Sequence, residues 1–265
     1  IRDVAVTGVQ TCALPIFAYD ALDHLQGISD PSGLDTVYDT NAFGDALGNQ
    51  SPDSGSTTIA TDAAGNPLIR TDARGVTVTS TYDALNRVTS ESYPDATLDV
   101  SYYYDEADAV TGCSDDYPIG RLTRIVEADG VATTYCYDRA GRVLRKTLTV
   151  AGATTTTQYG YTLAGRLSSM TYPSGAVLAY TRDGDGRISA ATLTPAGGGA
   201  AQSLVSPVAY APFGAVASYQ LGSGQTVTRA FDANGLISAV SSAVLGLAYS
   251  RDVEGNVTGV SGIST

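Results

Sequence analysis

The chain of 265 residues has few of the residue types on which most protein chemistry depends. It contains one lysine, one histidine (His24), one methionine, three cysteines and no tryptophan. A single histidine excludes a metal centre built from several imidazoles, and no Walker loop, H-E-x-x-H or C-x-x-C motif occurs. The net charge is -12, which argues against a nucleic-acid binder because such proteins neutralise phosphates with a basic face. No apolar run approaches the roughly 18 residues of a transmembrane helix. We therefore expect no enzyme activity, no cofactor and no membrane span.

Residues 1–16 differ from the rest of the chain, which has no initiator methionine. Within them, Val6–Ile16 (VTGVQTCALPI) resembles the translation of a constant segment of a common sequencing adapter. A signal peptide would need a basic n-region and an uninterrupted apolar core, and this stretch has neither. We predict that residues 1–16 are a disordered artefact in which Cys12 has no function. We also expect the remainder to be an internal piece of a longer protein.

A short motif recurs from Phe17 onward: an aromatic residue, Asp, two variable residues, Gly or another turn residue, a polar residue and an apolar residue. A complete copy is Tyr137–Val143 (YDRAGRV). The second motif position falls at residues 20, 41, 62, 83, 105, 138, 162, 183, 211, 232 and 252. The first five of these positions are almost evenly spaced, which chance does not produce. The longest step, from 105 to 138, contains an insertion at 106–119 that splits one copy into Tyr104-Asp105 and Gly120-Arg121-Leu122.

A second turn signal lies between consecutive motifs. Four glycines each follow the second position of their own motif at the same distance: Gly33, Gly75, Gly175 and Gly224. Each period thus has two turns separated by runs that alternate, as in Val76–Tyr82, and the run at 153–159 follows the same pattern. Such period-two alternation predicts strands, so one repeat is one β-hairpin. We predict an all-β fold of about eleven antiparallel hairpins, and a sheet of about twenty strands should curl.

The motif has the chemistry of a tight turn. The Asp side chain accepts bonds from nearby amides, and Gly supplies a positive φ, for which Asp23 and Asn86 are the next best substitutes. We expect the aromatic residue to end a strand and to pack on the tyrosine of the next hairpin. The residues predicted to build the repeat are Tyr19, Asp20, Asp62, Gly65, Tyr82, Asp83, Tyr104, Asp105, Gly120, Arg121, Tyr137, Asp138, Gly141, Arg142, Tyr161, Gly165, Asp183, Gly186, Phe231, Asp232, Gly235, Asp252 and Gly255.

The copy Tyr137–Val143, with Gly120-Arg121-Leu122-Thr123 upstream, resembles the YD repeat of bacterial Rhs proteins. Relatives of these proteins include the shell subunits of insecticidal toxin complexes and the animal teneurins. The resemblance extends over about Phe17 to Thr265. It implies a spiralling sheet that forms part of a hollow shell around the protein's own C-terminal toxin, in a secreted or cell-surface protein. The partners would be the other shell repeats, the core segment and the toxin of the same polypeptide.

The family's C-terminal core segment, which in many members cleaves itself, and a toxin domain are not found within these 265 residues, as we expect of an internal piece. Asp30–Leu34 looks like part of the core signature, but it occupies the position of an ordinary mid-repeat turn. The alternative function is a cell-surface module that binds carbohydrate or a partner protein, because Tyr-rich and Thr-rich faces suit sugar stacking.

Three further features have a plain structural explanation beside a functional one. Asp183–Gly186 (DGDG) hints at a calcium loop, but it lacks the closing Glu and coincides with a repeat motif. Asp115-Asp116 in the insertion fits a solvated loop better than an acid–base dyad. Cys113 and Cys136 can form a disulfide only if the insertion folds back, and the sequence leaves that open.

Overall fold

The structure, a computed structural model, describes residues 15–114 and 117–263. The chain divides into two units, residues 1–111 with 118–133 and residues 112–117 with 134–265. Regular structure in the described ranges consists of 22 strands of one antiparallel sheet, a 3-10 helix η1 (Ala96–Leu98) and a short helix α1 (Asp108–Thr111). The all-β array of antiparallel hairpins is therefore confirmed, whereas the hollow shell stays a prediction.

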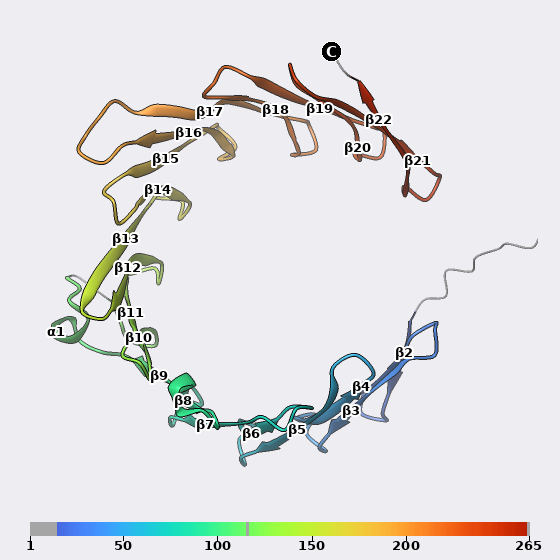
Figure 1. The fold of residues 1–265 in the computed structure, drawn as a ribbon, viewed down its shortest axis with the longest axis vertical. Helices are drawn as coiled ribbons and strands as arrows, with labels where there is room; N and C mark the ends of the chain where they lie inside the picture. The colour runs from blue at the N-terminus through green and yellow to red at the C-terminus, as the bar shows by residue number, and fades with distance from the viewer. Residues whose placement is uncertain (1–14, 115–116, 264–265) are drawn as a thin grey trace, which may run out of the picture. The chain divides into compact units, whose positions relative to one another are not determined.

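In the first unit, strands β1 to β10 lie in one layer, and each pairs antiparallel with the next strand along the chain (Figure 1). Their bounds are β1 (Ile16–Tyr19), β2 (Leu25–Ser29), β3 (Asp35–Thr40), β4 (Ala46–Ser51), β5 (Gly55–Thr61), β6 (Pro67–Thr71), β7 (Thr77–Tyr82), β8 (Val88–Ser92), β9 (Val100–Tyr104) and β10 (Leu122–Glu127). The division between the units falls inside β11 (Ala132–Tyr137).

The second unit repeats the same pattern, because each strand from β12 to β22 pairs antiparallel with its successor. These strands are β12 (Val143–Val150), β13 (Ala153–Tyr161), β14 (Leu167–Thr171), β15 (Val177–Arg182), β16 (Ile188–Thr194), β17 (Gln202–Tyr210), β18 (Val216–Leu221), β19 (Thr226–Phe231), β20 (Ile237–Ser241), β21 (Gly246–Arg251) and β22 (Val257–Ile263).

Alternating side chains make these segments strands rather than helices. In β7, Val78 and Tyr82 are half-buried while Thr79 and Thr81 are exposed, as predicted. In β13 the predicted strand forms, but burial does not alternate at its start, where residues 153–155 are all exposed. The reason is that β14 pairs only with residues 158–161 of β13, so the tip of the β12–β13 hairpin extends beyond its neighbour.

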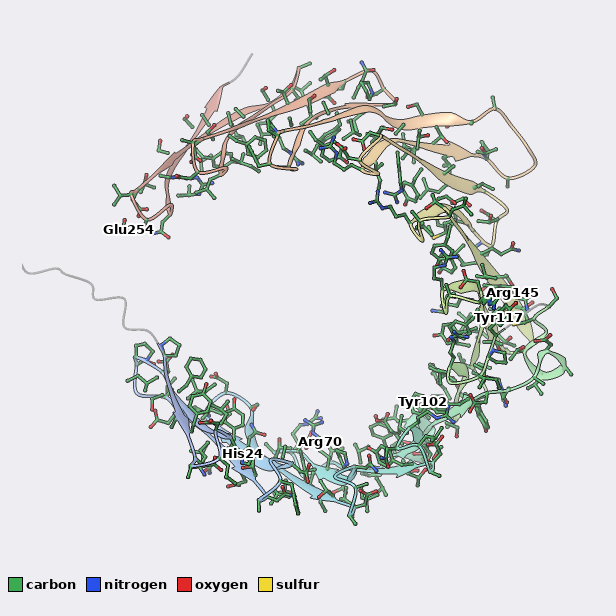
Figure 2. All side chains as sticks on the ribbon, turned by 180° about the vertical axis from the view of Figure 1, so that it is seen from behind. His24, Arg70, Tyr102, Tyr117, Arg145 and Glu254 are labelled. Carbon is green, nitrogen blue, oxygen red and sulfur yellow. A yellow bond between two sulfur atoms is a disulfide. The ribbon has the colours of Figure 1, made fainter. Side chains whose placement is uncertain are left out.

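Within each unit the sheet is a single layer with side chains on both faces (Figure 2). Few described side chains are buried: the apolar ones are Cys113, Cys136, Tyr137 and Ala211, and the polar ones are Thr111 and Thr123. No thick core is available to hold a hairpin in place. The hairpins must instead be stabilised by the backbone ladder and by contacts with adjacent hairpins, as in other repeat proteins.

The insertion does not interrupt the repeat. The amide of Asp105 donates to the carbonyl of Arg121 at 3.2 Å, and the amide of Gly120 donates to the Asp105 carboxylate at 2.5 Å. The split copy therefore closes as one turn across the insertion, as the sequence predicted. Asp115 and Asp116 lie outside the described residues.

The predicted artefact at the N-terminus also lies outside the described residues, except for Pro15 and Ile16. Ile16 begins β1 and lies opposite Ser29 of β2. The assignment of residues 1–16 to an adapter stays a prediction.

Candidate functional site

The turn that begins at each motif Asp, here called the motif turn, has a fixed backbone geometry. The amide of Asp138 donates to the carbonyl of Arg142, and the amide of Gly141 donates back to the carbonyl of Asp138, both at 2.9 Å. Gly141 has a φ of 83°. A reversal followed by one residue with positive φ is a standard way to close a hairpin.

The motif Asp side chain supplies hydrogen bonds that the reversed backbone cannot make. One carboxylate oxygen of Asp138 accepts from the amides of Ala140 and Arg142, each at 2.9 Å. The side chain of Arg142, and then its amide, hold the pKa of Asp138 below its ordinary value. Asp therefore serves here as a fixed acceptor, and a proton on it would weaken the turn.

The predicted repeat residues occupy equivalent places throughout the described chain. Each predicted Tyr or Phe is the last residue of its strand, and each predicted Asp follows directly after a strand. The predicted glycines all have positive φ, and Asp23 and Asn86 take the same conformation at φ of 63° and 59°. That these residues build and stabilise the repeat stays a prediction.

Motif turns differ from mid-repeat turns in one respect, a bulge. Thr81 lies opposite Ser90 and Tyr82 opposite Val88, so Thr89 has no partner across the ladder. The mid-repeat turn between β6 and β7 shows no such shift. A bulge adds local twist and bends its strand. A register shift also occurs at one mid-repeat pairing, between β16 and β17.

The residue four positions after the motif Asp joins one repeat to the next. Arg142 donates to the Asp138 carboxylate, and its guanidinium carbon lies 4.7 Å from the centroid of the Tyr161 ring, which belongs to the following motif. Such cation–π contacts stabilise by about 0.5–1 kcal/mol at exposed sites. The stacking recurs at 4.3 Å and 4.6 Å in the pairs Arg87–Tyr104 and Arg187–Tyr210.

The aromatic residue completes the link through its hydroxyl. Tyr161 donates to the carbonyl of Val143, the seventh residue of the preceding motif, at 2.9 Å. Two other tyrosines bond the equivalent carbonyls, in the pairs Tyr82–Pro67 and Tyr210–Ile188. Where the first position is arginine, the guanidinium reaches the same carbonyl, in the pairs Arg182–Leu167 and Arg251–Ile237. We call this combination of stacking and hydrogen bonding the inter-repeat clasp.

The motif glycine is also a point of close approach between repeats. A Cβ at Gly65 would lie 2.7 Å from a carboxylate oxygen of Asp45, and a Cβ at Gly44 would lie 2.9 Å from the ring of His24. Both intruding side chains occupy the fourth position after the second motif residue of the preceding copy. The glycine thus allows the turn and makes room for its neighbour.

The predicted packing of tyrosine on tyrosine is wrong at the copies that carry the clasp. At Tyr104, Tyr161 and Tyr210 the ring is covered by the arginine of the preceding motif, because a cation is attracted to the ring face. One aromatic contact between successive motifs does occur, where Phe213 and Phe231 meet edge to face at 5.0 Å.

A polar cluster that the sequence did not reveal fastens the start of the insertion. Glu106 pairs with Arg124 and accepts from the hydroxyl of Thr123, the most buried residue described. The guanidinium of Arg124 lies 3.9 Å from the ring centroid of Tyr103. The side chain of Arg124 chiefly, and Thr123 with it, hold the pKa of Glu106 below its ordinary value.

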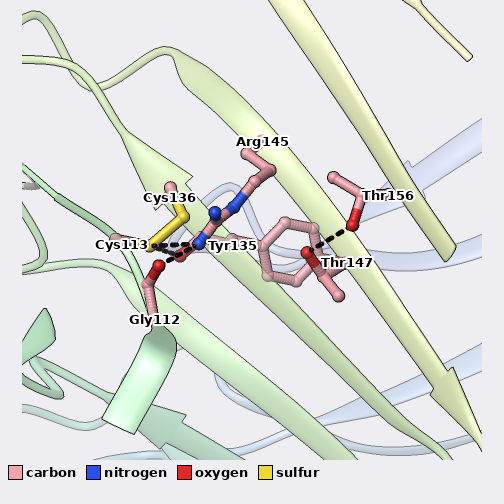
Figure 3. Close-up of a disulfide and its surroundings, with 7 residues drawn as sticks. All are labelled: Gly112, Cys113, Tyr135, Cys136, Arg145, Thr147 and Thr156. Atoms are coloured by element: carbon pink, nitrogen blue, oxygen red, sulfur yellow. Dashed lines mark hydrogen bonds between the residues drawn. A yellow bond between two sulfur atoms is a disulfide. The ribbon is translucent and has the colours of Figure 1, made fainter. Parts of the chain in front are cut away.

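Cys113 and Cys136 form a disulfide, which answers the question that the sequence left open. The insertion folds back so that Cys113 lies beside β11, with the two Cα atoms 5.7 Å apart. Arg145 of β12 donates to the carbonyl of Gly112 at 2.5 Å (Figure 3). A side chain of β12 thus contacts the insertion at Gly112.

The candidate sites at His24 and Asp183–Gly186 belong to motif turns. His24 approaches its own motif Asp20 at 3.0 Å, and Asp183 and Asp185 both pair with Arg187. In the described ranges, no three His, Cys, Asp or Glu residues gather as metal ligands would. The described helices include none long and apolar enough to cross a membrane.

Comparison with known proteins agrees with this architecture. The RHS Repeat family model matches residues 62–98, 118–155, 137–177 and 161–200. No curated protein matches the chain. Among solved structures, TcdB2-TccC3-Cdc42 has a TM-score of 0.78 and the Photorhabdus luminescens Tc holotoxin pore with a TccC3 mutation has 0.76, each at 18% identity. Each alignment covers 94% of this chain and 14% of the other.

The chain thus spans about one seventh of the length of these neighbours, and the likeness concerns the fold alone. The repeat matches are more specific, because they fall on segments in which the motif turn and the clasp recur. Together these findings show that the chain carries RHS repeats over residues 62–98 and 118–200.

Proposed function

We propose that this chain is a non-catalytic stretch of the wall of an RHS-repeat shell. The wall separates a toxin at the C-terminus of the same polypeptide from the cell that makes it, and the protein is secreted. The single observation that carries the proposal is the hairpin array that this chain shares with the TcdB2-TccC3 structures. A shell wall requires an unbroken sheet and no catalytic residues.

The clasp supports this role. A single-layer sheet has no second layer to stiffen it, so each hairpin must be tied to the next by side chains. Tyr161, Arg142 and Val143 provide such a tie, and equivalent contacts recur in both units. The charged members are used in ion pairs within the wall, which leaves them poorly placed for catalysis.

The test uses the complete gene product, including the sequence downstream of residue 265. Limited proteolysis should cleave its C-terminal region much more slowly in the intact protein than when that region is expressed alone. Equal cleavage rates would refute enclosure. Absence of a separate C-terminal domain in the gene would refute the toxin-shell role as well.

A second candidate function is carbohydrate binding at the cell surface. It is supported by a shallow cavity of about 290 Å³ in the second unit, lined by Tyr210, Tyr219, Arg229 and four aliphatic residues. A glycan array probed with this chain tests it. Selective binding that Tyr219→Ala abolishes and Tyr172→Ala does not would favour this function over the shell.

A further inference from the structure

We propose that the Cys113–Cys136 bridge is a site of thiol–disulfide exchange with small dithiols, in which Cys136 is attacked and Cys113 is the leaving thiolate. The proposal is independent of the shell function. It rests on the contacts of the two sulfurs and on the cavity beside them.

A small reagent can reach the bridge from solvent. The cysteines are only 8% and 6% exposed, but both line a solvent-open cavity of about 190 Å³. The other residues of its wall are Ser114, Leu144, Arg145 and Gln158. A water molecule occupies about 30 Å³ in the liquid, so the cavity has room for the reactive end of a small thiol.

A positive charge lies beside one of the two sulfurs. An Nη atom of Arg145 lies 3.8 Å from the Sγ of Cys113, and Figure 3 draws this contact beside the bond to the Gly112 carbonyl. A neighbouring guanidinium favours a thiolate over a thiol, and a sulfur that is better stabilised as an anion leaves faster. The carbonyl oxygen of Tyr135, also 3.8 Å from Cys113, favours the neutral thiol but carries only a partial charge.

The reaction balances with a dithiol as the reductant. A thiolate of the dithiol attacks the Sγ of Cys136, the bond to Cys113 breaks, and Cys113 keeps the electron pair. The second thiol then attacks the mixed disulfide and releases Cys136. The dithiol loses two electrons and two protons and becomes a disulfide, while the protein gains two reduced cysteines.

The structural consequence is release of the insertion at Cys113. The bridge joins Cys113 of the insertion to Cys136 of β11, which lie 23 positions apart, and so holds the segment around Cys113 beside that strand. We infer that this segment is fastened in oxidising surroundings and freed in reducing ones, as compartments differ in their ability to keep disulfides.

The experiment measures reduction of the bridge in the full chain by dithiothreitol at fixed pH. Arg145→Gln should slow the reduction about three- to tenfold, whereas Arg145→Lys should largely restore the rate. The matched control is Lys146→Gln, which removes an exposed charge one residue along β12 and should leave the rate unchanged. Equal rates in the wild type and Arg145→Gln would overturn the role of Arg145.

A second readout identifies the attacked sulfur without relying on rates. The oxidised chain is treated briefly with glutathione, quenched with acid and mapped by mass spectrometry. The mixed disulfide should be found on Cys136. A mixed disulfide predominantly on Cys113 would overturn the proposed direction even if Arg145→Gln disturbed the local fold.

Discussion

Removing the hydroxyl of Tyr161 should loosen the junction between two consecutive repeats while leaving the turn of each repeat intact. Tyr161→Phe deletes the 2.9 Å hydrogen bond to the Val143 carbonyl but keeps a ring beneath Arg142. The net contribution of such a bond is about 1 kcal/mol. Tyr161→Leu also removes the cation–π contact, which contributes about 0.5–1 kcal/mol, so its total effect should approach roughly 2 kcal/mol.

Hydrogen exchange of the backbone amides in β12 and β13 is the appropriate assay, because long repeat arrays need not unfold in one step. A loss of about 1 kcal/mol raises the opening constant about fivefold. Tyr172→Phe is the matched control, since Tyr172 lies at a mid-repeat turn and takes no part in a clasp. If the amides of β12 and β13 exchange at the same rate in Tyr161→Phe and Tyr172→Phe, the Tyr161 hydroxyl does not hold the two repeats together. If Tyr161→Leu is no worse than Tyr161→Phe, the stacking argument is wrong.

Three further predictions concern the turns, the disulfide and the insertion. Gly130 has a φ of 83° and open space around it, so Gly130→Ala should lower the free energy of unfolding by about 1 kcal/mol in urea titrations. Gly184 has no positive φ, so Gly184→Ala should change that free energy little, and equal effects of the two variants would contradict backbone strain as the cause. Cys136→Ser should lower stability by about 3 kcal/mol, the chain-entropy estimate for a bridge with a sequence separation of 23, and an unchanged thermal midpoint would refute that estimate. Glu106 has a pKa below its ordinary value, so the stability that it contributes is complete above the unfolded carboxyl pKa near 4.5 and is lost as pH falls through the folded value. Glu106→Gln should therefore flatten the acid side of the stability profile, and an unchanged acid slope would contradict this.

The hairpin array could be read from the sequence because its signals are local. Asp138 and Gly141 belong to the same turn, and their roles follow from what an Asx acceptor and a residue with positive φ can do within it. The spacing of these signals then gives two strands per repeat, whatever surrounds them. Even the split copy could be predicted, since Asp105 and Gly120 carry the same chemistry on either side of the insertion.

The clasp was missed because its members belong to different repeats. Arg142 and Tyr161 lie in successive motifs, and only the register of the intervening strands brings the guanidinium over the ring. A signal was available: arginine recurs four positions after the motif Asp, and an aromatic residue opens most copies. Read as a pair across the repeat boundary, these two regularities would have favoured cation–π stacking over contacts between tyrosines.

By itself, the amino-acid order determined where the chain reverses at the motif turns, because most of these reversals depend on Asp, Asn and Gly within a single turn. Tertiary structure decided the partners of side chains that lie a repeat or more apart. The disulfide needed the insertion to fold back onto β11, and Arg145 reached Gly112 only once that had happened. The physical reason is the difference in sequence distance between the interacting groups. Backbone conformation in a turn depends on immediate neighbours, whereas salt bridges, stacked rings and sulfur–sulfur bonds join residues that only the assembled sheet brings together.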